Sequence, residues 1–315
     1  MERRNFIKNS LLAAGSLSLT DNFLHAAERS TLSNEKSVLT GETGSSQNAP
    51  PLRKSIMWGT VGLQGSVLEK CKAIKAAGFD GIEPSSHDNR KEFIDAMAAT
   101  GLAASSVCSS KHWQITMSHP DAEVRSEAVK NMITAMEDAK AYKTDAVLLV
   151  PGVVNENTTY EECWTRSTEC IKELVPTAEK MQVKICVENV WNNFLLSPVE
   201  MRMYLEQFNS PYVGSYFDCG NILVYGWPEH WISALGSRII RIHIKEFSKQ
   251  IADKQGRGAG FSAPLTEGDV RWKEVMKEVR RHYKGGWLTT EQGSSKTLEE
   301  LKDLSARLDK ILALY

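Results

Sequence analysis

The chain has 315 residues, of which 42% are hydrophobic and 24% are charged. These proportions are ordinary for a globular protein, and the length suffices for one α/β barrel or for two smaller domains. Its 38 Lys and Arg residues against 39 Asp and Glu residues leave a formal net charge of −1. This balance excludes a general electrostatic attraction to nucleic acid or to an anionic membrane. The 6 cysteines contain no CxxC pair, which predicts thiols in or near the core rather than a disulfide framework.

Residues 1–27 differ in character from the rest of the chain. Paired arginines, Arg3 and Arg4, precede an apolar run from Leu11 to Leu19. The run is too short to cross a bilayer, so no membrane span is expected here. The pattern resembles a twin-arginine export signal, which implies a periplasmic location. A disordered basic N-terminus is the alternative.

Residues 28–53 are rich in Ser, Thr, Asn, Gly and Pro. Such a composition is typical of a flexible, disordered linker. We therefore expect the folded domain to span residues 54–315.

Short apolar runs alternate with helical patterns along this folded part. Eight of them have the length and composition of strands: residues 54–60, 79–84, 102–108, 146–151, 183–189, 213–219, 239–245 and 286–292. Apolar residues recur at helical spacing from Val124 to Ala139. Another helix is predicted to begin at Thr159, where Glu162 completes a capping box. Gly78 and Gly101 each follow a helical stretch, where a left-handed residue would end it.

The alternation of strands and helices predicts a parallel sheet. Eight strands can close a (β/α)8 barrel, or TIM barrel, of roughly 250 residues, a size that residues 54–315 match. The runner-up is an open doubly wound sheet, which would place GxGxxG after the first strand. The segment GTVGLQG at residues 59–65 does not match that motif. The expected fold class is therefore α/β, with a single (β/α)8 barrel.

Acidic and histidine side chains stand at the ends of the last four predicted strands. They are Glu188, Asp218, His243 and Glu291. In barrels of this kind, catalytic groups gather at the carboxyl ends of the strands. Side chains alternate between the two faces of a strand, and here the aliphatic residues take the face opposite to the polar ones. We expect the aliphatic residues to face outward to the helices and the four polar side chains to converge in the barrel mouth.

Three carboxylates and one imidazole in one mouth require compensation of their charge. One divalent cation held by all four side chains would supply it. An oxygen-rich donor set favours Mn²⁺ or Mg²⁺, and Co²⁺ or Zn²⁺ is also possible. On the same face as His243, Lys245 is expected to hold a substrate oxygen. Arg241 lies deeper on that face, where it could balance a buried carboxylate.

Six short segments occur in the order seen in the xylose isomerase-like barrels of sugar isomerases and epimerases. They are GFDGIEP, VLLVPG, ICVENV, YFDCGN, RIHIKEF and TTEQG, and the resemblance covers roughly residues 54–310. In that family, the residues that correspond to the four strand-end side chains bind one divalent metal. The two glutamates also exchange protons with the sugar carbons beside the carbonyl. The resemblance thus implies that Glu188 and Glu291 are catalytic.

Two positions depart from the family members that act on free ketoses. Those enzymes often have a His three residues after the metal-binding Asp, where this chain has Asn221, and a second Glu six residues after the first, where it has Phe194. The segment Asp-Cys-Gly-Asn looks more like that of pentulose-5-phosphate epimerases. Phosphorylated sugars are kept in the cytoplasm, however, and a phosphate site should show a Gly-rich cradle or converging cations. Since the mouth lacks a clear example, we expect an uncharged substrate.

The first half of the chain adds candidates for substrate binding beside Asn221. His112 and Trp113 follow the third predicted strand in a long loop and could line a sugar site, with an ordinary surface loop as the alternative. Glu83 ends the second strand and is expected to face the mouth. Residues 247–265 form a candidate lid.

The predicted activity is that of a metal-dependent isomerase or epimerase acting on a ketose or keto-sugar. One glutamate would remove the proton α to the carbonyl, leaving an enediolate, and the other would return a proton. If the same first step is followed by loss of a β-substituent, the enzyme is a lyase. If that elimination runs backward with addition of water, the enzyme is a hydratase. Both alternatives would act on 3-keto-glycosides or 3-keto-2-hydroxyglucal. These outcomes stay open, because they differ only in what lies at the second face of the substrate.

Two other interpretations have less support. The endonuclease IV-like branch of the same fold needs several zinc-binding histidines and a basic groove, whereas only His243 is among the strand-end ligands. An exported sugar-binding protein without catalysis would not need both proton-transfer glutamates. The expected partner is therefore a small sugar rather than nucleic acid, and a homo-oligomer remains open.

Overall fold

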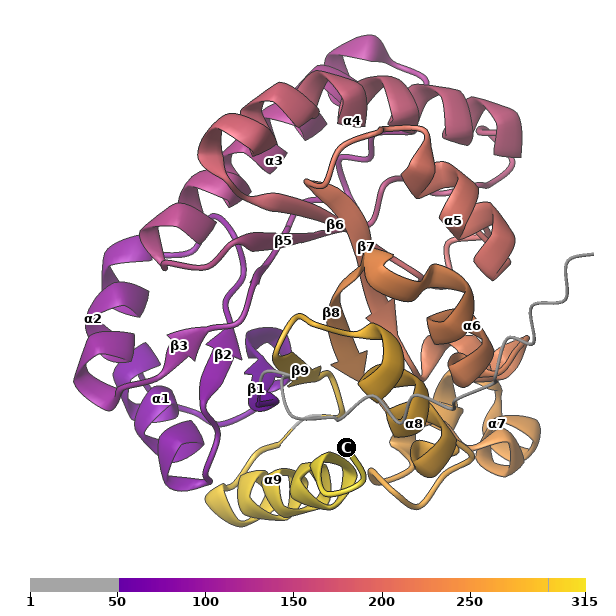
Figure 1. The fold of residues 1–315 in the computed structure, drawn as a ribbon. Helices are drawn as coiled ribbons and strands as arrows, with labels where there is room; N and C mark the ends of the chain where they lie inside the picture. The colour runs from indigo at the N-terminus through magenta and orange to yellow at the C-terminus, as the bar shows by residue number, and fades with distance from the viewer. Residues whose placement is uncertain (1–50, 294) are drawn as a thin grey trace, which may run out of the picture. The chain divides into compact units, whose positions relative to one another are not determined.

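Parallel strands surrounded by helices make up residues 51–293 and 295–315, which are the residues that the computed structural model describes (Figure 1). The expected export signal and residues 28–50 of the expected linker lie outside this described part. Within it, nine strands form one sheet: β1 (Arg53–Met57), β2 (Gly81–Glu83), β3 (Ala103–Ala104), β4 (Val107–Cys108), β5 (Ala146–Leu149), β6 (Lys184–Glu188), β7 (Val213–Asp218), β8 (Ile239–Ile244) and β9 (Trp287–Thr290). The first strand thus begins one residue before the expected start of the domain.

The order of the strands is that of a barrel. The sheet runs β3-β2-β1-β9-β8-β7-β6-β5-β4, and its neighbouring strands are parallel. The two edges, β3 and β4, are halves of the one strand expected at 102–108. A parallel bridge between Ser85 and Cys108 joins the end of β2 to β4. The barrel is therefore nearly closed, which confirms the predicted fold class.

The third predicted strand is interrupted at Ser105 and Ser106. The Ser105 N–H still donates to the Ile82 carbonyl over 2.9 Å. Its carbonyl oxygen, however, accepts hydrogen bonds from Arg241 Nε at 2.8 Å and Thr144 Oγ1 at 3.0 Å. The expectation of one continuous strand was wrong here, because the apolar pattern does not register side chains that compete for a backbone oxygen.

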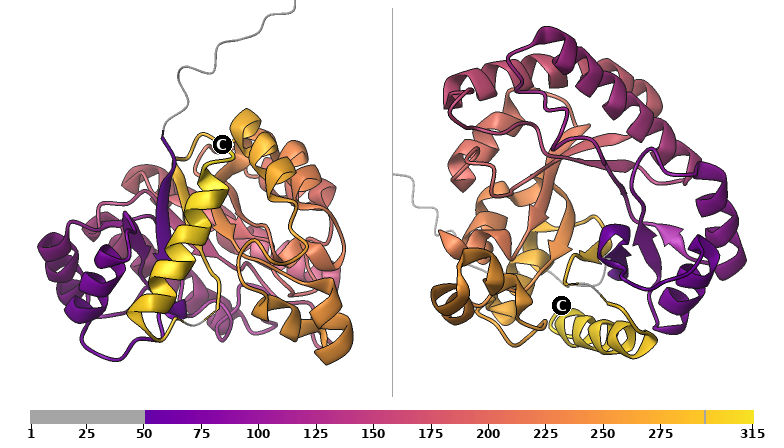
Figure 2. Two further views of the ribbon diagram at one scale, coloured as in Figure 1. Left: turned by 90° about the horizontal axis from the view of Figure 1, so that it is seen from below. Right: turned by 180° about the vertical axis from the view of Figure 1, so that it is seen from behind.

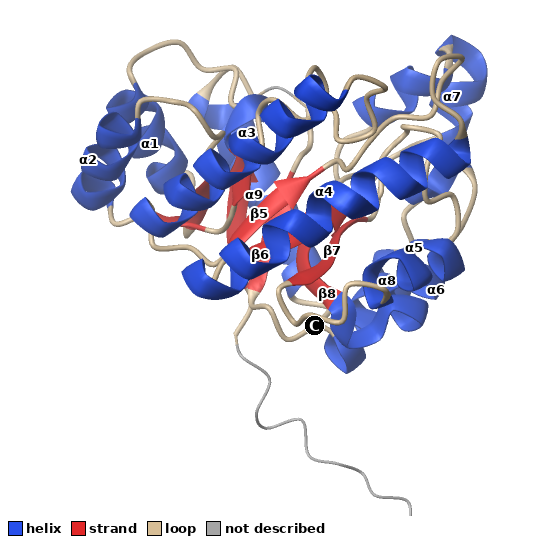
Figure 3. Ribbon diagram, turned by 90° about the horizontal axis from the view of Figure 1, so that it is seen from above, coloured by secondary structure: helices blue, strands red, loops and turns tan. Residues whose placement is uncertain are grey.

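Helices follow the strands and cover the outside of the sheet (Figure 3). The described residues contain α1 (Val67–Ala76), α2 (Arg90–Thr100), α3 (Ala122–Ala141), α4 (Tyr160–Met181), α5 (Pro198–Glu206), α6 (Pro228–Leu235), α7 (Lys249–Gln255), α8 (Trp272–His282) and α9 (Leu298–Leu312). The predicted capping box of Thr159 and Glu162 begins α4, and Gly101 ends α2 in the left-handed conformation with φ 67°. The last helix, α9, lies beside α1 and completes the ring (Figures 1 and 2).

The outer core confirms the predicted alternation of side chains. Ile185, Val187, Ile242, Ile244 and Leu288 belong to the cluster beneath the helices, and each is 0% exposed. Burying an aliphatic side chain of this size contributes about 1.5–3 kcal/mol, so the ring of helices holds the strand register firmly. All six cysteines, which lie within the described residues, are buried free thiols, as expected.

Ile240 is an exception to the alternation. The register between β7 and β8 shifts between Ser215 and Tyr216, as at a β-bulge. Ile240, expected to face outward, packs instead against the cluster inside the barrel. Gly214 makes room for it, because a Cβ at that position would lie 2.4 Å from Ile240 Cδ1.

Candidate active site

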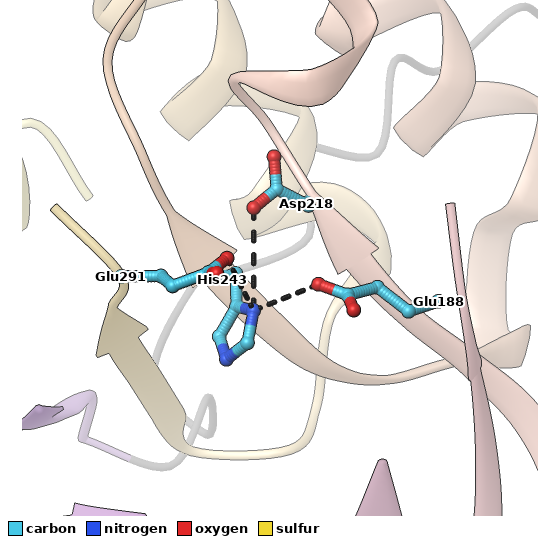
Figure 4. A group of neighbouring side chains, drawn as sticks. All are labelled: Glu188, Asp218, His243 and Glu291. Carbon is cyan, nitrogen blue, oxygen red and sulfur yellow. Dashed lines mark hydrogen bonds and ion pairs between the residues drawn. The ribbon is translucent and has the colours of Figure 1, made fainter. Parts of the chain in front are cut away.

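Four strands deliver the predicted polar side chains to one place. Glu188 and Asp218 end β6 and β7, His243 is the penultimate residue of β8, and Glu291 directly follows β9. One ligand atom from each of the four lies within 4.8 Å of those from the others. Figure 4 shows the side chains pointing toward one another, with Glu188 and Glu291 on opposite sides of His243. We call these four residues the carboxylate–histidine cluster.

His243 Nδ1 is the centre of the cluster. It lies 2.9 Å from Glu188 Oε1, 3.3 Å from Glu291 Oε2 and 4.0 Å from Asp218 Oδ2. The His243 and Asp218 side chains are 0% exposed, whereas the Glu291 side chain is 22% exposed. The cluster is therefore buried on one side and open to the mouth at Glu291.

The two oxygens of Asp218 differ in their partners. Oδ1 accepts a hydrogen bond from the Asn221 N–H over 2.6 Å. Oδ2 is buried without a hydrogen-bond partner among the described residues. A buried, unpartnered carboxylate oxygen is costly unless a cation compensates it. Three carboxylates and one imidazole nitrogen at this spacing are the donor types of a hard divalent cation, so the residues fit a metal site.

Burial and mutual repulsion shift the pKa values of the cluster. Burial raises the pKa of Glu188, and it raises the pKa of Asp218 to about 8. Burial would also raise the pKa of Glu291, but Lys245 and His243 together hold it below its usual range. For His243, burial acts to lower the pKa, and the surrounding Tyr216, Glu83, Glu188 and Glu291 raise it well above normal. So much negative charge calls for a compensating cation.

Glu83 lies beneath the cluster rather than in the mouth. It is 0% exposed, and its Oε2 lies 2.8 Å from His243 Nε2. Its Oε1 accepts a hydrogen bond of 2.7 Å from Ser106 Oγ, which is 3.0 Å from the Tyr216 hydroxyl. Glu83 was expected to bind substrate, but its carboxylate is fully buried against His243 and does not line the neighbouring pocket.

Lys245 and Glu291 face each other across the opening of the cluster. Lys245 Nζ donates to Glu291 Oε2 over 3.0 Å and lies 4.5 Å from the centre of the Phe261 ring. Burial would lower the pKa of Lys245, but Asp218, Glu291 and Glu188 raise it above its usual value. Lys245 is therefore a charged donor at the edge of the site.

A pocket of about 200 Å³ opens beside the cluster. It is lined by Met57, Cys108, His112, Trp113, Leu148, Glu188, Val190, Trp191, Asn221, Lys245, Phe261 and Glu291. The structure therefore brings six of the predicted site residues to this pocket and leaves Glu83 out of it. Asp218 and His243 lie behind its wall.

His112 is a neutral wall of this pocket. Its side chain is 7% exposed, and its Nδ1 accepts a hydrogen bond of 3.3 Å from the Val150 N–H. Burial lowers the pKa of His112 to about 4, against a small opposing effect of Glu291. At neutral pH its imidazole is therefore uncharged.

Comparison with known proteins agrees with this architecture. The family model described as xylose isomerase-like TIM barrel matches residues 71–311. The chain belongs to this family. Among curated proteins it is similar to the L-ribulose-5-phosphate 3-epimerase UlaE of Salmonella paratyphi A, with 23% identity over 228 residues, covering 68% of this chain and 78% of the relative.

Solved structures of similar barrels superpose on most of the chain. A D-tagatose 3-epimerase-like protein has a TM-score of 0.69 at 18% identity, covering 82% of this chain and 98% of its own. The 3-keto-D-glucoside 4-epimerase YcjR of E. coli has a TM-score of 0.69 at 13% identity, with the same coverage of 82% and 98%. At these identities the likeness shows the fold alone.

Glu246, which was not among the predicted site residues, organises the loop over the mouth. It is 0% exposed, and its carboxylate accepts hydrogen bonds from the N–H groups of Thr266 at 2.9 Å and Val270 at 3.0 Å. It also accepts one from Trp272 Nε1 at 2.8 Å. Burial raises the pKa of Glu246, while these donors oppose the shift. The one sequence feature that could have indicated its role is its position directly after the strand predicted at residues 239–245.

The expected lid at 247–265 folds as helix α7 followed by a 3-10 helix, Arg257–Ser262. Gln292 ties it to the barrel: its Nε2 donates to the carbonyls of Phe261 and Ala263, both at 2.8 Å. The tied segment places Phe261 against the pocket, where Trp191 packs on it with ring centres 4.8 Å apart. These two aromatic walls were also absent from the predicted site.

In residues 51–293 and 295–315, every helix is too short or too polar to cross a bilayer.

Proposed function

We propose that the protein is a divalent-metal-dependent sugar isomerase or epimerase that removes the proton α to the carbonyl of an uncharged ketose or keto-sugar. One observation carries the proposal: Glu188 and Glu291 line the same pocket from opposite sides of a buried histidine (Figure 4). Two carboxylates so placed can act on two positions or two faces of one small ligand. The similarity to sugar epimerases agrees with this assignment.

The four residues of the carboxylate–histidine cluster would hold the metal. When bound, the cation would supply Lewis-acid polarisation of the carbonyl and its neighbouring hydroxyl. Glu83 favours a proton on His243 Nε2, 2.8 Å away, so that Nδ1 presents its lone pair to the cluster. A cation at Nδ1 competes with the proton that the raised pKa of His243 places there, so binding is expected to strengthen as pH rises.

The two glutamates divide the proton transfers between them. Lys245, 3.0 Å from Glu291, keeps that carboxylate ionised and able to accept a proton. Burial raises the pKa of Glu188, which suits a group that both takes and returns a proton. Each needs its target proton within about 3 Å, which a single sugar ring in a pocket of this size permits.

The pocket lining favours a neutral substrate. Lys245 is the single Lys or Arg among the lining residues, and Glu291 already pairs with it. Arg257 lies with its guanidinium over the Trp191 ring, 4.4 Å from the ring centre. Phosphate recognition usually uses converging cations or a helix N-terminus. The relative UlaE is an epimerase of a phosphorylated sugar, so substrate charge is a point on which we propose that this chain differs from it.

We further propose that the chain acts outside the cytoplasm. The support is the order of Arg3, Arg4 and the apolar run that follows them. An uncharged sugar is the kind of substrate available there, so the two proposals agree.

Incubation with Mn²⁺ and a panel of ketoses, phosphoketoses and 3-keto-glycosides in D₂O tests the activity. We expect solvent deuterium at the carbon beside the carbonyl of a neutral sugar, detected by NMR and mass spectrometry. The same spectra identify an isomer, an epimer or an eliminated product, and so separate isomerase and epimerase from lyase or hydratase. Full activity after removal of metal by a chelator, or exchange with phosphorylated sugars alone, would contradict the proposal.

A further inference from the structure

A polar hollow adjoins the pocket at the mouth of the barrel. It lies between the loop after β4 and the loop after β5, and Trp113 lines both spaces. The hollow measures about 660 Å³, against about 200 Å³ for the pocket beside the cluster. Ligand pockets usually measure ~300–1,000 Å³, so the pocket by itself suits one small ring. The hollow adds room for a second.

Trp113 forms an aromatic surface at this junction. It is 47% exposed, although an indole has a large apolar area to bury. Its ring meets His112 edge-on, with centres 5.8 Å apart and planes at 80°. The Val150 N–H holds the His112 ring in place, and His112 in turn packs against Trp113 and fixes its position. The apolar face of a sugar ring packs well on such a surface.

Apart from Pro120 and Val153, the remaining lining is polar. Gln114, Asn155 and Asn157 are exposed there beside Thr158 and His119, and the lining residues include no Lys, Arg, Asp or Glu. Amide side chains both donate and accept hydrogen bonds, as sugar hydroxyls do. A phosphate or carboxylate ligand would instead call for cations. The chemistry of the hollow therefore fits a neutral polyol.

The two loops that form the hollow are held in place. The backbones of Asn155 and Thr158 exchange hydrogen bonds of 3.1 and 3.2 Å, and Asn155 Oδ1 accepts the Asn157 N–H at 2.9 Å. Ser118 Oγ accepts the Val153 N–H at 3.0 Å and so joins one loop to the other. Gly152 allows this approach, since a Cβ there would lie 2.6 Å from Ser118 Cβ. A preformed site loses little entropy on binding.

We propose that this hollow is a second sugar subsite, so that the substrate is an uncharged keto-glycoside of at least two sugar units. The reacting ring would occupy the pocket beside Glu188 and Glu291. The next unit would stack on Trp113 and bond to the amides of Gln114 and Asn157. This inference rests on the proposed function and narrows its substrate class.

The test compares matched substrates that differ by one sugar unit. Methyl 3-keto-glucoside is set against the 3-keto derivatives of maltose, cellobiose and trehalose, with solvent deuterium incorporation giving kcat/KM for each. For the wild-type protein we expect at least one disaccharide to exceed the monosaccharide by roughly tenfold or more, as one or two added hydrogen bonds and a stacking contact imply. Gln114→Ala and Asn157→Ala should each lower that ratio by roughly threefold to tenfold.

Met203→Ala is the control, because Met203 is 56% exposed on α5 and lines neither space. It should leave the ratio unchanged, and melting temperatures verify that all three variants fold. If deuterium exchange is equally fast for substrates of one and two sugar units, and the variants do not change it, the subsite is overturned and the proposed function stands. Calorimetric measurement of disaccharide binding tests the case in which the subsite exists but the proposed activity does not. Binding that weakens in Asn157→Ala without any exchange supports the subsite and overturns the proposed function.

Discussion

Glu83 and His243 form a fully buried pair, with Glu83 Oε2 2.8 Å from His243 Nε2 and neither side chain exposed. Ser106 holds the second oxygen of Glu83 through a hydrogen bond of 2.7 Å. A carboxylate at Nε2 orients the ring and leaves Nδ1 toward the carboxylate–histidine cluster. Glu83 is thus a positioning residue, although it lies 160 residues from His243 in the sequence.

The first prediction concerns this pair. Glu83→Gln removes the charge that supports His243 while keeping its shape, so the affinity for Mn²⁺ should fall about 10–100-fold. Titration calorimetry measures the affinity, and Glu229→Gln, a change at another buried glutamate, serves as the control. Unchanged affinity in Glu83→Gln would show that His243 needs no orienting partner.

The second prediction separates the glutamates from simple ligands of the sugar. Glu188→Gln and Glu291→Gln should each lower kcat by about 10²–10⁴-fold, since each removes a group that carries a proton in the transition state. Binding of a substrate analogue should change far less. Deuterium incorporation under saturating substrate gives kcat, and near wild-type turnover in either variant would remove that glutamate from the mechanism.

The third prediction concerns Glu246 and the lid. Glu246→Gln weakens three hydrogen bonds to Thr266, Val270 and Trp272, and should lower the unfolding free energy by about 2 kcal/mol. It should also raise KM, because the loop that it anchors carries Phe261 to the pocket.

The control for Glu246 is in the same loop. The Glu267 side chain is 54% exposed and pairs with Arg307 over 2.6 Å, so Glu267→Gln should cost less than about 1 kcal/mol. Denaturant unfolding and steady-state kinetics measure both variants. Equal effects of the two substitutions would contradict an anchoring role for Glu246.

The fourth prediction is a pH dependence of stability. Burial lowers the pKa of His112 from 6.5 to about 4, so the unfolded chain binds this proton more readily than the folded one. The stability from neutral His112 is fully present above pH 6.5 and is lost as pH falls to 4. The loss amounts to about 3 kcal/mol. Denaturant titrations at each pH measure the unfolding free energy. The His112→Asn variant should lack the loss between pH 6.5 and 4, and identical pH profiles of the variant and the wild type would contradict the prediction.

The fifth prediction tests export. Replacing Arg3 and Arg4 together by Lys should leave the full-length chain in the cytoplasm, because a twin-arginine route requires both guanidinium groups. Lys8→Arg is the control, because it also exchanges one cationic side chain for the other without a change of charge, outside the arginine pair. Cell fractionation with immunodetection gives the distribution. A wild-type chain retained in the cytoplasm would contradict the proposed location.

Sequence patterns predicted the barrel and the placement of the four cluster residues because both follow from local rules. Alternation along β6 and β8 sends Ile185 and Ile242 outward and Glu188 and His243 inward, whatever the rest of the fold does. The same rule failed at Ile240, where a bulge between β7 and β8 changed the register. A bulge depends on the neighbouring strand, so one strand's own pattern does not contain it.

By itself, the sequence determined the alternation of strands and helices, the faces of most strand side chains and the residue types available at the strand ends. Only the tertiary structure decided which of those residues touch. It placed Glu83 under His243, turned the Ser105 carbonyl to Arg241, and joined the Trp113 loop to the Asn155 turn. The physical reason is range: secondary structure follows from spacings of a few residues, whereas these contacts depend on how strands far apart in the chain close into one barrel.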